Sequence, residues 1–175
     1  MVRGDPMNSA YRPCSLVVKS LAMLALCLVF VSSRPVLAGE DTIIPEAGVS
    51  TEAIVKALQD ANMNAKLDSD GDAQVRVARQ EFWMQGDIDR SRIYFLTFRA
   101  FKDGVTQERK MAFVHEINDS LVLVRATLTG KGRLWLDYAF PTEAGITPKQ
   151  IAALTARFGG VINMIDDADT EGLLE

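Results

Sequence analysis

The chain has 175 residues, of which 48% are hydrophobic and 24% are charged, values typical of a folded globular protein. Its formal net charge is −4, and its Lys and Arg residues are scattered along the chain. A nucleic-acid-binding role, which needs clustered cations to neutralise phosphates, is therefore excluded. The length fits one domain, or one domain with an export segment.

Residues 1–38 have the pattern of a secretory signal peptide. Arg3, Arg12 and Lys19 give a basic start, and an uninterrupted apolar run of 11 residues follows at 21–31. Small or slim residues precede a cleavage site after about Ala38. The apolar run is shorter than the ~20 residues that span a bilayer. We therefore expect a periplasmic or secreted protein, with an uncleaved anchor as the alternative.

Both cysteines, Cys14 and Cys27, lie in this segment. Leu26 precedes Cys27, where a lipid-attachment motif needs a small residue, so no lipid anchor is expected and no stable membrane insertion remains after cleavage. The mature chain then has no disulfide, thiol nucleophile or thiolate metal site, and its net charge is −7. Met1 and Met7 both remain candidates for the true start.

Residues 39–48 read as a flexible lead-in, and the patterns that follow predict helices and strands in alternation. Helical spacing predicts an amphipathic helix over 51–62 with its N-cap at Ser50 or Thr51. Two short strands are predicted at 65–67 and 73–79, with the turn 68–72 between them.

This turn places Asp68, Asp70 and Asp72 at alternate positions, as in a calcium-binding loop. An EF-hand loop has Gly at its sixth position and Glu at its twelfth, whereas here Gly is fourth and Arg79 is twelfth. A hairpin turn with a left-handed Gly71 is the favoured interpretation.

The next segment contains the candidate partner-binding residues Phe82, Trp83 and Met84, followed by a second turn signal. The segment reads as a short strand or an edge segment. If these three side chains are exposed, they form a plausible protein-binding patch. The alternative is that they fill the core.

Residues 92–140 are predicted to carry most of the core. Strands are expected at Ile93–Phe101, Leu121–Leu128 and Arg133–Phe140, and a helix at Thr106–Ile117 with a narrow buried stripe. That stripe consists of Met111, Val114 and Ile117. The strand at Ile93–Phe101 is apolar on both faces, which indicates a central strand.

A last helix begins at Thr147 with an N-cap, Pro148 in its first turn and Gln150 completing a capping box. The pair Gly159-Gly160 within it predicts a kink or a close backbone contact. The acidic tail 169–175 is expected to fray.

No catalytic constellation emerges from these patterns. His115 is the only histidine, so a two-histidine metal site within the chain is impossible, and a structural or surface histidine is the favoured reading. The sequence Gly130-Lys131-Gly132 is a hairpin turn without the spacing of a phosphate-binding loop. We expect no cofactor, no metal site and no enzymatic activity.

The element order and several segments resemble the YbjN family of bacterial sensory transduction regulators, over about residues 45–168. The segments that carry the resemblance are Leu96–Phe101, the helix end His115–Asn118, the strands Val122–Ala126 and Leu134–Tyr138, and the capped last helix. The resemblance implies an α+β fold similar to type III secretion chaperones, with an antiparallel sheet of about five strands flanked by three helices. It also implies stress-response regulation through protein binding and supplies no catalytic residues. The family's members are often cytoplasmic, so the export signal departs from the family.

The predicted organisation is a signal peptide at 1–38, a lead-in at 39–48, a YbjN-like domain at 49–168 and the tail at 169–175. The leading hypothesis is an exported, non-enzymatic domain that binds a protein partner and is a candidate homodimer. The alternatives are a small-ligand or metal-dependent periplasmic enzyme using acidic turn residues such as Asp68 and Asp70, and a structural component of the envelope.

Overall fold

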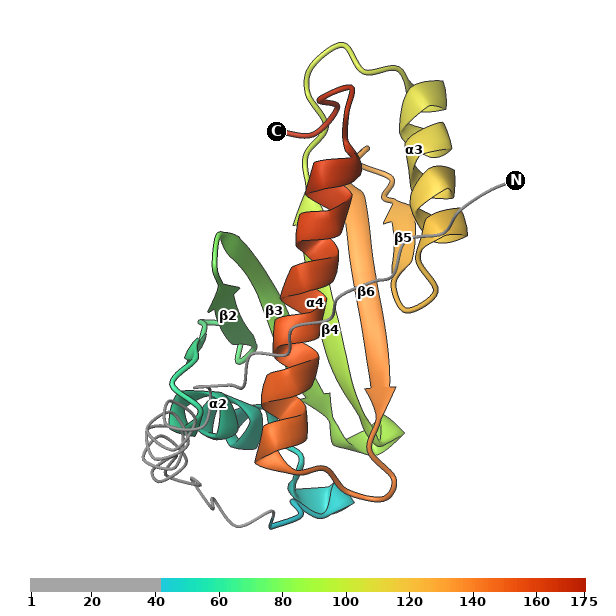
Figure 1. Ribbon diagram of the computed structural model, residues 1–175. Coiled ribbons are helices and arrows are strands. Elements are labelled where there is room, and N and C mark those ends of the chain that lie inside the picture. The colour runs from blue at the N-terminus through green and yellow to red at the C-terminus, as the bar shows by residue number, and fades with distance from the viewer. Residues whose placement is uncertain (1–41) are drawn as a thin grey trace, which may run out of the picture. The chain divides into compact units, whose positions relative to one another are not determined.

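The computed structural model describes residues 42–175, and the predicted signal peptide lies outside the described residues. This part of the chain is an α+β domain built on a six-stranded antiparallel sheet with the order β1-β2-β3-β4-β6-β5 (Figure 1). The strands are β1 (Asn64–Leu67), β2 (Ala73–Val77), β3 (Gln80–Asp87), β4 (Arg92–Arg99), β5 (Arg125–Leu128) and β6 (Leu134–Pro141). The helices are α2 (Thr51–Asp60), α3 (Gln107–Ser120) and α4 (Pro148–Ala168), with 3-10 turns η1 (Glu46–Gly48) and η2 (Ile88–Arg90).

One face of the sheet is covered by helices. In Figure 1, α4 runs along the sheet in front of β3, β4 and β6, while α2 lies near the start of α4. Phe158 of α4 packs between Phe82 and Phe95. Its ring centroid lies 5.1 Å from that of Phe82 and 5.3 Å from that of Phe95. Both sheet residues are fully buried, so this contact lies at the centre of the core.

The predicted N-cap and capping box of α4 are confirmed. The Thr147 hydroxyl accepts the Gln150 N–H at 3.1 Å, and the Gln150 side chain accepts the Thr147 N–H at 2.8 Å. The helix continues through the glycine pair to Ala168. A Cβ on Gly159 would lie 3.0 Å from the Val77 Cβ, so of the two expected consequences the close contact is confirmed.

The segment around Trp83 is an interior strand of eight residues, and the expectation of a short or edge strand was wrong. It adds the sixth strand to the five expected. The reason lies in its alternation: Phe82 and Met84 face the helices, so the strand must sit between neighbours that bury them.

The strand predicted at Leu121–Leu128 was too long, because only Arg125–Leu128 pairs with β6. Helix α3 instead continues to Ser120, three residues past the predicted end. Its buried stripe also differs, since Phe113 replaces Met111, which is 53% exposed. Phe113 packs edge-to-face on Phe101, and this contact decides which side of α3 is buried.

Both ends of the described chain are attached to the domain. Ile44, in the expected flexible lead-in, forms a two-residue bridge with Ile146. At the other end, Leu173 and Leu174 are buried rather than frayed, because Asp169 accepts both of their N–H groups at 2.7 and 2.8 Å. None of the helices between residues 42 and 175 combines the length and apolar character that a membrane crossing requires.

Candidate functional site: the open face of the sheet

The strands present a second surface, which we call the open face: their outward side chains on the side opposite α4. Alternation fixes its membership, because neighbouring residues of a strand point to opposite faces. On β3 and β4, Trp83, Leu96 and Phe98 are half-buried, while the residues between them are in the core. No described helix packs over this face, so its side chains are accessible to a partner.

A row of stacked rings crosses the open face over three strands. The rings of Trp83 and Phe98 are 5.3 Å apart and nearly parallel, with an interplanar angle of 11°. Trp135 on β6 continues the stack, 6.4 Å from Phe98 at 26°. The Arg133 guanidinium lies 3.9 Å from the Phe98 ring centroid, a cation–π contact with an exposed cation. The row therefore combines apolar area with positive charge.

Beside this row lies a buried carboxylate, that of Asp137. Asp137 is 5% exposed and receives two hydrogen bonds from Arg125, Nε to Oδ1 at 2.9 Å and Nη2 to Oδ2 at 2.7 Å. These bonds raise the pKa of Arg125 above its usual range. Burial raises the pKa of Tyr94, which lies opposite Ala139 on the same face. The Arg125 guanidinium thus neutralises the buried charge of Asp137 through two hydrogen bonds in a fork geometry.

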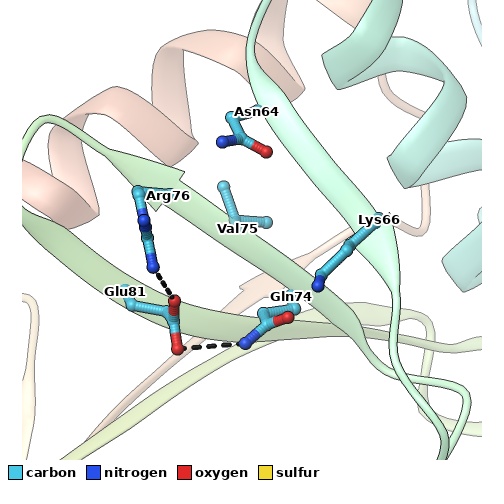
Figure 2. A pocket seen from close by; sticks show the side chains of 6 residues that line it. All are labelled: Asn64, Lys66, Gln74, Val75, Arg76 and Glu81. Atoms are coloured by element: carbon cyan, nitrogen blue, oxygen red, sulfur yellow. Dashed lines mark hydrogen bonds and ion pairs between the residues drawn. The ribbon is translucent and has the colours of Figure 1, made fainter.

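The far end of the open face is polar. A pocket of about 250 Å³ lies over β1, β2 and β3. Its lining residues, drawn in Figure 2, are Asn64, Lys66, Gln74, Val75, Arg76 and Glu81. Glu81 accepts hydrogen bonds from Arg76 at 2.7 Å and from Gln74 at 3.0 Å. The bond from Arg76 is the main reason that the pKa of Glu81 is lowered. Lys66 forms no ion pair with a described residue, so the pocket keeps one free cation.

The open face differs in charge from the rest of the domain. It carries five cations, Lys66, Arg76, Arg92, Arg125 and Arg133, and four anions, Glu81, Asp87, Asp137 and Asp72, which accepts a hydrogen bond from Gln85 of this face. Residues 42–175 as a whole contain 15 Lys and Arg against 20 Asp and Glu, a net charge of −5. The open face is therefore +1, and the remaining described residues are −6. Such an asymmetry favours an acidic partner on the open face.

The structure separates the three residues of the candidate partner-binding patch. Phe82 and Met84 are fully buried under the helices, so their side chains fill the core and present no surface. Trp83 alone reaches the open face. The sequence showed its alternation but not its neighbours Phe98 and Trp135, because these come together only through the pairing of β3, β4 and β6.

The other candidate residues do not assemble into a site. His115 is on the surface with its side chain 78% exposed, 3.4 Å from Asp119. The Asp68 carboxylate accepts the N–H groups of Asp70 and Asp72 at 2.9 and 3.0 Å, and Gly71 has a φ of +86°. The hairpin-turn interpretation is confirmed. Within residues 42–175, no group of three or more His, Cys, Asp and Glu residues is arranged to hold a metal ion.

Comparison with known proteins places this fold in a family. The model of the YbjN family, described as "Putative bacterial sensory transduction regulator", matches residues 50–171. The chain belongs to the YbjN family. A search of curated proteins found no match.

Two solved structures illustrate the likeness. The crystal structure of YbjN from E. coli, described as "a putative transcription regulator", superimposes with a TM-score of 0.58 at 18% identity, covering 71% of this chain and 94% of that one. This similarity shows a shared fold. The HopA1-SchA chaperone-effector complex gives a TM-score of 0.46 at 12% identity, covering 65% of this chain and 88% of that chain.

Proposed function

We propose that this YbjN-family protein is exported and works as a non-catalytic regulator by binding an acidic protein partner on its open face. The observation that carries the proposal is the aromatic row of Trp83, Phe98 and Trp135, which no described helix covers. Aromatic and Arg side chains are the residue types that dominate binding energy at protein interfaces. The partner supplies apolar groups over the ring edges and carboxylates to Arg133 and Lys66.

The charge asymmetry supports a partner that binds through charged groups as well as apolar ones. Three of the five cations on the open face already have carboxylate partners: Arg76 with Glu81, Arg92 with Asp87, and Arg125 with Asp137. Lys66 and Arg133 form no ion pair with any described residue and are free to meet the partner's carboxylates. Binding should therefore weaken as salt is raised.

Affinity purification from periplasmic extract tests this function. The wild-type protein should retain one stoichiometric partner, and a variant with Trp83→Ala and Arg133→Glu should lose it. Met111→Ala is a matched control, because Met111 is an exposed apolar residue of α3 away from the open face. Circular dichroism and thermal melting establish that each variant is folded. A partner retained by the open-face variant, or repeated purification without any partner, would contradict the proposal.

Export is tested by the mass of the protein recovered from cells. Cleavage after about Ala38 should leave a chain that starts at Gly39 and fractionates with the periplasm or medium. Recovery of the chain with residues 1–38 intact, in the cytoplasm or bound to the membrane, would contradict this part of the proposal and leave partner binding untouched.

A further inference from the structure

One edge of the sheet is only half occupied. Strand β6 has eight residues, but β5 pairs only with Leu134–Asp137. The rest of β6, Tyr138–Pro141, has β4 on one side and no described strand on the other. Figure 1 shows β6 running well beyond the end of β5.

The hydrogen bonds show which backbone groups point to this free edge. The Asn118 side chain bonds both the N–H and the C=O of Ala126 from outside the sheet. The backbone N–H and C=O of Ala126 therefore point away from β6, and those of its neighbour Arg125 point toward Asp137. Alternation then points the N–H and C=O of Ala139 to the same side as those of Asp137. The Thr142 N–H donates to the carbonyl of Ser91, the residue before β4, so the backbone of Thr142 points toward the β4 side. Ala139, three residues earlier, therefore points away from β4, to the free edge.

The other outward-facing alanines of the sheet edges are protected by side-chain amides. Gln59 donates to the Ala65 carbonyl of β1 at 2.9 Å. Asn118 bonds Ala126 of β5 at 2.9 and 2.8 Å. Ala139 is exposed and receives no such bond from a described residue. Exposed, unpaired edge groups are a template for an added strand.

The surroundings of Ala139 leave room for a strand and include exposed apolar side chains. A pocket of about 470 Å³ lies here, lined by β6, the end of α3 and the residues before β5. Its rim includes Val122, 99% exposed, and Leu123, 47% exposed. On the helix side, the half-buried Tyr138 and Phe140 flank Ala139, and Phe140 lines a second pocket of about 210 Å³ beside α4.

We propose that the free edge of β6, at Tyr138–Pro141, binds an extended segment of a partner polypeptide as an added antiparallel strand. The segment exchanges two hydrogen bonds with Ala139. Its residues on either side of that position point toward the helix side beside Tyr138 and Phe140, so they are apolar. The recognised pattern is apolar, any residue, apolar.

A second copy of this chain does not fit the edge. Antiparallel pairing of two β6 strands around Ala139 would place Pro141 of one copy opposite Asp137 of the other, and that edge of Asp137 is already occupied by Arg125. An extended segment whose chain leaves the sheet before Asp137 avoids this overlap. The edge borders the open face, because Arg125 and Asp137 line its pocket, but it binds through the β6 backbone, so this inference does not rest on the proposed function.

NMR titration with a synthetic peptide tests the proposal. The probe is acetyl-Thr-Val-Thr-Val-Thr-amide, and the control is the same peptide with an N-methyl group on its central residue, which removes the donor to Ala139. The protein purified from cells should show amide shifts at Tyr138–Phe140 and Val122–Leu123. The control peptide should bind at least about tenfold more weakly.

Two variants at one position complete the test. Ala139→Pro removes the free N–H at an edge position where proline is tolerated, and should weaken binding of the probe at least about tenfold. Ala139→Val keeps the N–H and should bind like the wild type. Equal binding of the N-methylated peptide, shifts confined to the pocket around Lys66 and Arg76, or no shifts at all would overturn the proposal. Loss of the open-face partner in the other experiment, with probe binding intact, would leave it standing.

Discussion

The two faces of the sheet are made by alternate residues of the same strands, yet they have different roles. On β4, Phe95 is fully buried against α4, whereas Phe98, three residues later, is half-buried in the aromatic row. Both faces are rich in large apolar side chains. What separates core from surface is therefore the docking of the helices and not the hydrophobicity of the strand.

The largest expected effect comes from the covered face. Phe95→Ala should lower the free energy of unfolding by about 3–5 kcal/mol, because it leaves a cavity between Phe158 and Tyr138. Urea denaturation measures the loss. Phe98→Ala is the matched change on the open face and should cost only about 1–2 kcal/mol, from lost ring stacking and partial burial. Similar losses of unfolding free energy at Phe95 and Phe98 would contradict the distinction between the covered face and the open face.

A glycine on the covered face gives the next effect. A Cβ on Gly86 would lie 2.3 Å from the Val49 carbonyl oxygen and 2.9 Å from the Thr51 nitrogen. Gly86→Ala should therefore cost about 1–3 kcal/mol, since the start of α2 must move away from β3. The neighbouring change Gln85→Ala, on the open face, should cost less than 1 kcal/mol, about the value of its single hydrogen bond to Asp72. Thermal melting compares the two.

The side chain of Asn118 links α3 to the edge strand β5. Asn118→Ala removes two hydrogen bonds to Ala126 and should cost about 1–2 kcal/mol. Amide hydrogen exchange at Ala126 should accelerate, because its N–H then faces water. Asn118→Asp keeps the acceptor and should leave that amide more protected than the alanine variant does. Unchanged exchange in both variants would show that the amide does not depend on Asn118.

The smallest expected effect is a pH dependence on the open face. The hydrogen bond from Arg76 lowers the pKa of Glu81 below its ordinary 4.5. Its contribution to stability is therefore present above about pH 4.5 and is lost as the pH falls through the lower, folded-state pKa. The pair is largely exposed, so the contribution should be below about 1 kcal/mol. The difference in unfolding free energy between wild type and Glu81→Gln should shrink from pH 7 to pH 3.

Much of this domain follows from local sequence. The capping box of α4, the turn at Asp68 and the two-residue alternation of β6 are short-range patterns, because their hydrogen bonds and side-chain directions involve residues a few positions apart. The α+β fold was implied by the family resemblance and is confirmed, and His115, expected to be a structural or surface histidine, is on the surface. The family resemblance is confirmed by the family model.

Only the tertiary structure decided which apolar faces are buried. Met111 and Phe113 are both apolar, and the contact with Phe101 selects Phe113 for the core. In the same way, Trp83 joins Phe98 and Trp135 only because β3, β4 and β6 pair in one register. The free edge at Ala139 likewise depends on where β5 stops. Each of these contacts links distant positions in the chain, and a sequence pattern constrains the direction of a side chain but not the partner that it meets.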